Sequence, residues 1–89
     1  MKAVITVVGR DMVGILARVA NECAKVNANV IEVNQSVLQD MFAMIMLIDI
    51  TKLSCELTVF SENMNALGDE LGLKILVMHE DIFNSMHRV

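Results

Sequence analysis

The sequence predicts an α+β domain whose elements follow in the order strand, helix, strand, strand, helix, strand. Two segments repeat apolar residues every three or four positions, which is the spacing of amphipathic helices. Four other segments are rich in β-branched residues or alternate between apolar and polar, as strands do. With 89 residues and no linker or low-complexity segment, the chain is expected to form one domain over residues 1–89.

The first strand and the first helix meet at a turn that contains two glycines. Residues 2–8 are predicted to form the strand, because they are largely β-branched and Gly9 follows as a stop. Residues 14–26 are predicted to form the helix, and Asn27-Ala28-Asn29 to end it. The expected buried face of this helix consists of Leu16, Val19, Ala20, Cys23 and Val26.

Two strands joined by a short turn are predicted next. Residues 30–38 alternate between apolar and polar, which is typical of an edge strand with one face in water. The turn Gln39-Asp40 predicts that this strand pairs with the following one as a hairpin. Residues 41–50 are apolar on both faces, so we expect a central strand that is buried on both sides. The domain's own helices are expected to cover one face, and a partner is the candidate cover for the other.

A second helix and a last strand complete the pattern. Ser54 is a candidate N-cap, and the apolar stripe after it has helical spacing and ends before Gly72. This stripe consists of Leu57, Phe60, Met64, Leu67 and Leu71. Residues 73–78 are predicted to form the last strand, and the tail of residues 81–89 to add one amphipathic turn over residues 81–88.

The order of these elements fits two βαβ units with right-handed crossovers. Two such units give a ferredoxin-like βαββαβ sandwich, with a four-stranded antiparallel sheet of order 4-1-3-2 and two helices on one face. Many functions use this fold, so the function must be inferred from a site rather than from the fold.

The composition of the chain limits its partners and its compartment. The net charge of −4 argues against binding to nucleic acid or to an anionic membrane surface. No apolar run is long enough to span a bilayer, and the apolar stretch before Gly9 is too short for a secretory signal, so we expect a cytoplasmic protein. Cys23 and Cys55 are expected to be buried free thiols. Hydrophobic residues make up 55% of this short chain, which predicts a homodimer or a higher oligomer.

The candidate binding site is the turn between the first strand and the first helix. Gly9 can adopt φ values closed to other residues, and Gly14 leaves room for a ligand to approach. The free N–H groups that open the helix favour an anion. Asp11 either caps these groups or offers its charge to a ligand, and Arg10 is either a solvated loop charge or part of the site.

RNA-binding domains and acylphosphatases also use this fold. RNA binding would need exposed aromatic residues on the first and third strands, and the first strand has none. Gly14 and Arg18 have the spacing of the loop glycine and the arginine in acylphosphatases, which suggests a hydrolase as an alternative. Arg18 equally fits the polar face of the first helix.

The remaining reactive side chains do not indicate catalysis. His79 and His87 lie near Glu80 and Asp81, but they have no established metal-ligand spacing, so no metal is expected. No serine has a recognisable histidine base, so we expect no enzyme activity.

Four segments resemble a known family. Residues 8–19 (VGRDMVGILARV) contain the pattern acidic-x-x-Gly-aliphatic-Leu, and Asn29-Val30-Ile31 begins the second strand. Glu70-Leu71-Gly72-Leu73 ends the second helix, and residues 82–88 lie in the tail. Together with the element order, they resemble the ACT domain family over essentially the whole chain, in particular free-standing ACT proteins related to the glycine cleavage system repressor.

The resemblance implies a regulatory module that binds an amino acid, without a cofactor. The ligand-binding residues that it implies are Arg10, Asp11, Met12, Val13, Gly14, Ile15 and Asn29. Of these, Asn29 is alternatively explained by the exit from the first helix.

ACT domains commonly pair side by side through the first helix and the second strand, so the resemblance implies a homodimer with its amino-acid site at the interface. Face-to-face packing through the third strand is the alternative arrangement. A regulated protein is a further expected partner. The alternatives to amino-acid sensing are a purely structural dimerisation module and the hydrolase that would use Arg18.

Overall fold

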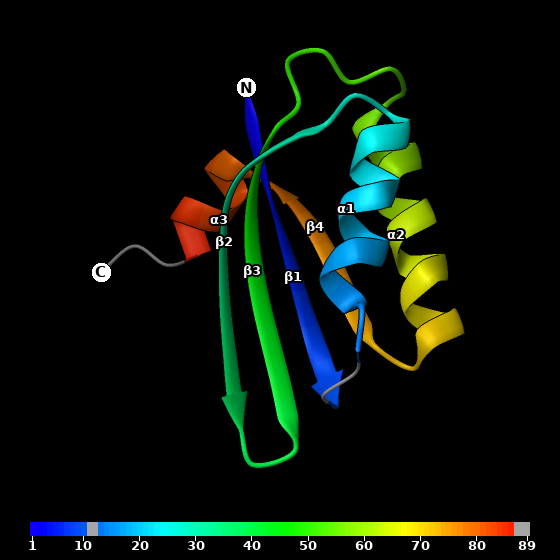
Figure 1. Cartoon of the computed structure of the whole chain (residues 1–89). Coiled ribbons are helices and arrows are strands. Elements are labelled where there is room, and N and C mark those ends of the chain that lie inside the picture. The colour runs from blue at the N-terminus through cyan, green and yellow to red at the C-terminus, as the bar shows by residue number, and fades with distance from the viewer. Residues whose placement is uncertain (11–12, 87–89) are drawn as a thin grey trace.

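The computed structural model describes residues 1–10 and 13–86 of the chain (Figure 1). The elements are β1 (Lys2–Arg10), α1 (Ile15–Lys25), β2 (Asn29–Leu38), β3 (Met41–Asp49), α2 (Leu57–Leu71), β4 (Lys74–His79) and α3 (Glu80–Met86). The four strands form one antiparallel sheet in the order β2-β3-β1-β4, which is the expected order 4-1-3-2 read from the other edge. The ferredoxin-like fold is therefore confirmed.

The sheet carries helices on both of its faces. α1 and α2 cover one face, as expected, and α3 lies against the opposite face (Figure 1). The amphipathic turn expected from residue 81 is thus a helix that begins at Glu80. Phe83 is half-buried there, whereas Ile82 and Met86 are exposed. No helix in the described part of the chain is long and apolar enough to cross a membrane.

The core lies between the sheet and the helices α1 and α2. Alternate residues of the strands point into it, because successive side chains of a strand lie on opposite faces. The most deeply buried large side chains are Ile5, Val7, Met44, Met46, Ile48 and Ile75 from the sheet, with Val19, Cys23, Phe60 and Met64 from the two helices. The helical stripes inferred from spacing therefore face the sheet, although Leu16 of the first stripe is exposed.

The outer face of β3 is not buried within a single chain. Burial alternates along this strand, and Met41 and Ile45 remain 46% exposed on the face opposite α1 and α2. α3 is short and lies along β1 and β4, so it leaves much of this face uncovered. The apolar character on both sides of β3 therefore produces burial on only one side within one chain.

The predicted boundaries were wrong at two places. β1 continues through Gly9 to Arg10, so Gly9 is not the stop, and the glycines with positive φ are Gly14 and Gly72. Gly9 instead allows close packing, because a Cβ there would collide with the side chain of Leu73. Ser54 does not cap α2, since Glu56 occupies the N-cap position.

The two cysteines are free thiols, as expected, but only one of them is buried. Cys23 lies in the core on α1 and is fully buried. Burial raises the pKa of its thiol to about 11. Cys55 is only half-buried and precedes α2 rather than lying within a helix.

Candidate functional site

The turn between β1 and α1 lies at one end of the sheet. Arg10 is exposed and ends β1 opposite Met41 of β3. Val13 is fully exposed, whereas Ile15 is buried and anchors the first turn of α1 in the core. Asp11 and Met12, which were predicted to contribute to the site, lie outside the described residues.

Gly14 determines how α1 begins. It occupies the N-cap position with φ 83° and ψ 9°, a left-handed conformation that glycine adopts without steric cost. The first helical hydrogen bond runs from the Arg18 N–H to the Gly14 carbonyl over 3.0 Å. The N–H groups of residues 15–17 precede that bond and have no acceptor within the helix. This turn therefore offers main-chain donors to an anion.

Asn29 lies at the other end of the sheet. It begins β2 and pairs with Asp49 at the end of β3. A surface pocket of about 350 Å³ opens there, lined by Asn27, Asn29, Asp49, Thr51 and Lys52. The walls of this pocket therefore carry a carboxylate, an ammonium group, a hydroxyl and two amides, which together donate and accept hydrogen bonds.

A single chain does not bring the two halves of the predicted site together. Lys2 and Asn29 both pair with Asp49 at one end of the sheet. Arg10 and Leu38 both pair with Met41 at the other end. The first turn and Asn29 are therefore separated by the whole length of β2, as the courses of β1 and β2 in Figure 1 show.

Asp49 is a pocket residue that the sequence analysis did not identify. Its Oδ1 accepts a hydrogen bond of 2.8 Å from the backbone N–H of Thr51. Hydrogen bonds from the side chain and the backbone of Thr51 hold the pKa of Asp49 below its usual value, and the positive charges of the N-terminus and Lys2 lower it further. A signal was present, because an aspartate that bonds the N–H two residues later is typical of turns after strands.

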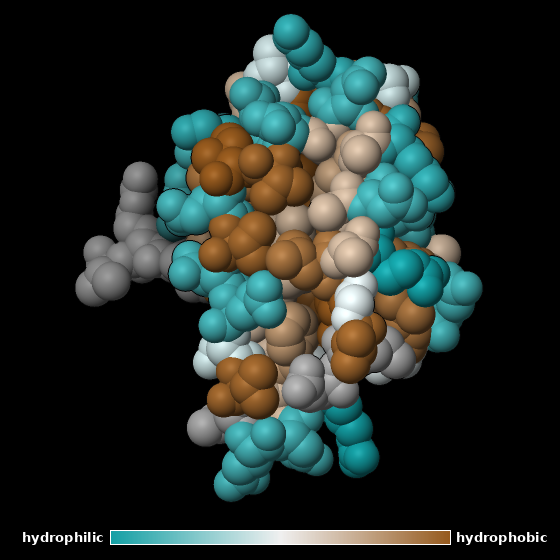
Figure 2. Space-filling view, in the orientation of Figure 1, coloured by the Kyte–Doolittle hydropathy of each residue, from teal (hydrophilic) through white to brown (hydrophobic). Residues whose placement is uncertain are grey.

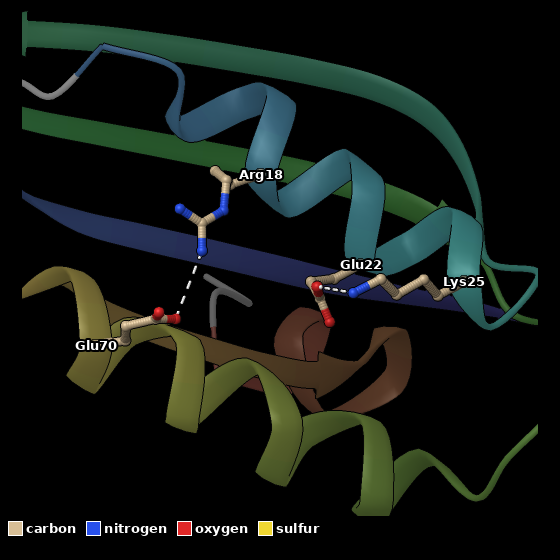
Figure 3. A network of polar contacts seen from close by, with 4 residues as sticks. All are labelled: Arg18, Glu22, Lys25 and Glu70. Carbon is tan, nitrogen blue, oxygen red and sulfur yellow. Dashed lines mark hydrogen bonds and ion pairs between the residues drawn. The ribbon is translucent and has the colours of Figure 1, made fainter.

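Arg18 points away from the first turn. Its guanidinium lies 3.5 Å from the carboxylate of Glu70 on α2, and Lys25 lies 2.9 Å from Glu22 on the same side of α1 (Figure 3). This placement agrees with the interpretation of Arg18 as part of the polar face of α1. The hydrolase alternative would need the guanidinium at the first loop instead.

The histidine and acidic residues near the tail do not form a metal site among the residues described. His79 Nδ1 accepts a hydrogen bond of 3.1 Å from the Asp81 N–H at the start of α3. Within residues 1–10 and 13–86, no three side chains of histidine, cysteine, aspartate or glutamate are placed to hold a metal ion. His87 lies outside the described residues.

The chain is similar in sequence to a family model and to several curated proteins. The model of the ACT domain matches residues 2–79. UPF0237 protein MK1213 of Methanopyrus kandleri is 41% identical over 99% of this chain and 98% of its own length. UPF0237 protein MMP0657 of Methanococcus maripaludis is 45% identical over 97% of this chain and 96% of its own length.

Solved structures agree with this assignment. An ACT domain protein from Streptococcus pneumoniae superposes with a TM-score of 0.81 at 34% identity, covering 93% of both chains. A putative glycine cleavage system transcriptional repressor shares the fold with a TM-score of 0.68 at 24% identity, covering 85% of this chain and 43% of its own. On the evidence of its sequence, its fold and these relatives, the chain belongs to the ACT domain family.

Proposed function

We propose that the chain is a regulatory module that binds an amino acid between two copies of itself. Membership of the ACT family supports regulation rather than catalysis. The observation that carries the proposal is the separation of the first turn from Asn29 at opposite ends of β2. Antiparallel pairing of two copies places Asn29 of the partner subunit at the same end as the first turn of this chain.

The side of the molecule formed by β2 and α1 has the surface that such pairing needs. β2 is an edge strand, so its outward backbone groups can pair with another strand. Ile31 and Val37 of β2 are 46% and 56% exposed, and Leu16 of α1 is also exposed. Figure 2 shows a band of apolar atoms between β2 and α1. Contact with a second copy would remove this band from water.

The positions of these residues favour one register. Ile31 and Val37 lie three residues before and three residues after Asn34. If two β2 strands pair antiparallel around Asn34, each Ile31 lies beside the partner's Val37 on the side that carries α1. The same register places Asn29 near the partner's Gln39, at the end of the sheet where β1 leads into the first turn.

This arrangement assigns each part of the ligand a partner. The main-chain N–H groups at the start of α1 would hold the carboxylate, Asp11 the ammonium group, and Asn29 of the partner subunit a further polar group. An amino acid bound in this way would favour one packing of the two chains, and a regulated protein would respond to that packing. The negative net charge and the free cysteines suit a module that works in the cytoplasm.

The experiment is a thermal-shift screen of the twenty amino acids, followed by calorimetric titration of those that stabilise the protein. Asp11→Ala and Asn29→Ala should each weaken binding, whereas Asn65→Ala, an exposed asparagine on α2, should not. Mixing the Asp11→Ala chain with the Asn29→Ala chain should restore one intact site in each mixed dimer. A site contained within one chain would show no such restoration.

Two results would overturn the proposal. If no amino acid binds, the chain is better described as a structural dimerisation module. If tight binding survives both Asp11→Ala and Asn29→Ala, the ligand site lies elsewhere.

A further inference from the structure

We propose that the pocket beside Asn29 selects the side chain of the bound amino acid, and that it prefers a side chain ending in a carboxamide or a carboxylate. The inference rests on the proposed function, in which the first turn of one chain binds the ligand's carboxylate and ammonium groups. The ligand's side chain then points toward the partner's pocket, which Asp49, Thr51 and Lys52 complete.

The pocket has the properties of one half of a binding site that a second chain would complete. The pocket of about 350 Å³ is large enough for an amino-acid side chain, yet all of its lining residues except Asp49 are exposed in a single chain. In the register around Asn34, the first turn of the second copy would approach this opening. Covering the pocket would lower the local dielectric constant and strengthen its hydrogen bonds.

The chemistry of the walls indicates which side chain fits. Lys52 forms no ion pair with any described residue, so its ammonium group can donate to a ligand oxygen. Asn27 and Asn29 can also donate through their amides. An oxygen acceptor at the end of the ligand's side chain would satisfy these donors, whereas a hydrocarbon end would leave them desolvated and unpaired.

Asp49 adds discrimination between a carboxamide and a carboxylate. The backbone N–H of Thr51 donates to Oδ1 of Asp49, and because a carboxylate has about four lone-pair sites, Asp49 can still accept further hydrogen bonds beside those from Thr51. A carboxamide can donate to Asp49 and accept from Lys52 at the same time. A carboxylate gains more from Lys52 but is repelled by Asp49, so the balance of these two residues determines the preference.

The test uses three ligands of similar shape, glutamine, glutamate and methionine, in calorimetric titration of the full chain. Glutamine and glutamate should bind at least about tenfold more tightly than methionine, which corresponds to one net hydrogen bond. Asp49→Asn should raise the affinity for glutamate relative to that for glutamine. Lys52→Met should lower the affinity for glutamate relative to that for glutamine. The matched controls Asp69→Asn and Lys74→Met change exposed residues on α2 and β4 and should leave the ranking unchanged.

The outcomes separate this inference from the proposed function. If amino acids bind and Asn29→Ala weakens their binding, but methionine binds as tightly as glutamine, only the selectivity inference is overturned. The same holds if Lys52→Met and Asp49→Asn leave the ranking unchanged. If no amino acid binds at all, the proposed function itself fails, and the selectivity inference fails with it.

Discussion

Replacing Gly68 by alanine tests how closely α2 packs on β4. Gly68 is buried in the last turn of α2, where alanine would ordinarily stabilise a helix by about 1 kcal/mol over glycine. A Cβ at this position would lie 2.8 Å from the Leu73 carbonyl oxygen and 3.2 Å from Cγ1 of Ile75. The first contact is with backbone, which cannot rotate away as a side chain can.

The packing cost should exceed the gain in helix propensity. Overpacking in a core costs about 1–3 kcal/mol. Leu73 has little freedom to move, because its N–H donates a hydrogen bond of 2.8 Å to the Gly68 carbonyl. We therefore expect Gly68→Ala to lower the free energy of unfolding by about 1 kcal/mol net, which corresponds to a fall in Tm of about 4–8 °C.

The assay is urea unfolding followed by circular dichroism, at one fixed protein concentration because association of two chains would also stabilise the fold. Asn65→Ala is the control, since Asn65 is exposed on α2 and should show only the gain in helix propensity, about 0.5 kcal/mol. The two variants should thus shift stability in opposite directions. An increase of about 1 kcal/mol for Gly68→Ala would refute the close approach of α2 to β4.

Three further predictions concern thiols, pH and assembly. In the native protein, iodoacetamide should modify Cys55 before Cys23, and equal labelling rates would contradict the burial of Cys23. The free energy of unfolding should fall as pH rises from 9.0 to about 11, because the unfolded state releases the Cys23 proton at a lower pH than the folded state does. Because the pKa of Asp49 is depressed in the folded state, the free energy of unfolding should fall as pH drops below the ordinary carboxyl value of 3.8 and through the lower folded-state pKa. Urea unfolding at several pH values should show this loss, and the loss should be smaller in Asp49→Asn. Val37→Lys should convert the proposed dimer to monomer in sedimentation equilibrium, while Ile45→Lys, on the opposite face of the sheet, should not. The reverse pattern would favour face-to-face packing.

The two halves of the proposed site differed in how well the sequence indicated them. The first turn could be predicted from the sequence, because glycines between a strand and a helix indicate a backbone conformation with positive φ, and Gly14 adopts one. The pocket beside Asn29 was found only in part, since Asp49 ends β3 and Thr51 and Lys52 follow it, far along the chain from Asn29. Pairing of β2 with β3 is what places them side by side.

The sequence by itself determined the order of the elements, the antiparallel sheet and the central place of β3. These features follow from periodicity and connection rules that act within each segment or between successive ones. The tertiary structure decided the continuation of β1 to Arg10, the helical tail across the sheet and the need for a glycine at position 68. It also placed the first turn and Asn29 at opposite ends of the sheet, because that distance depends on strand register, which only contacts between distant segments establish.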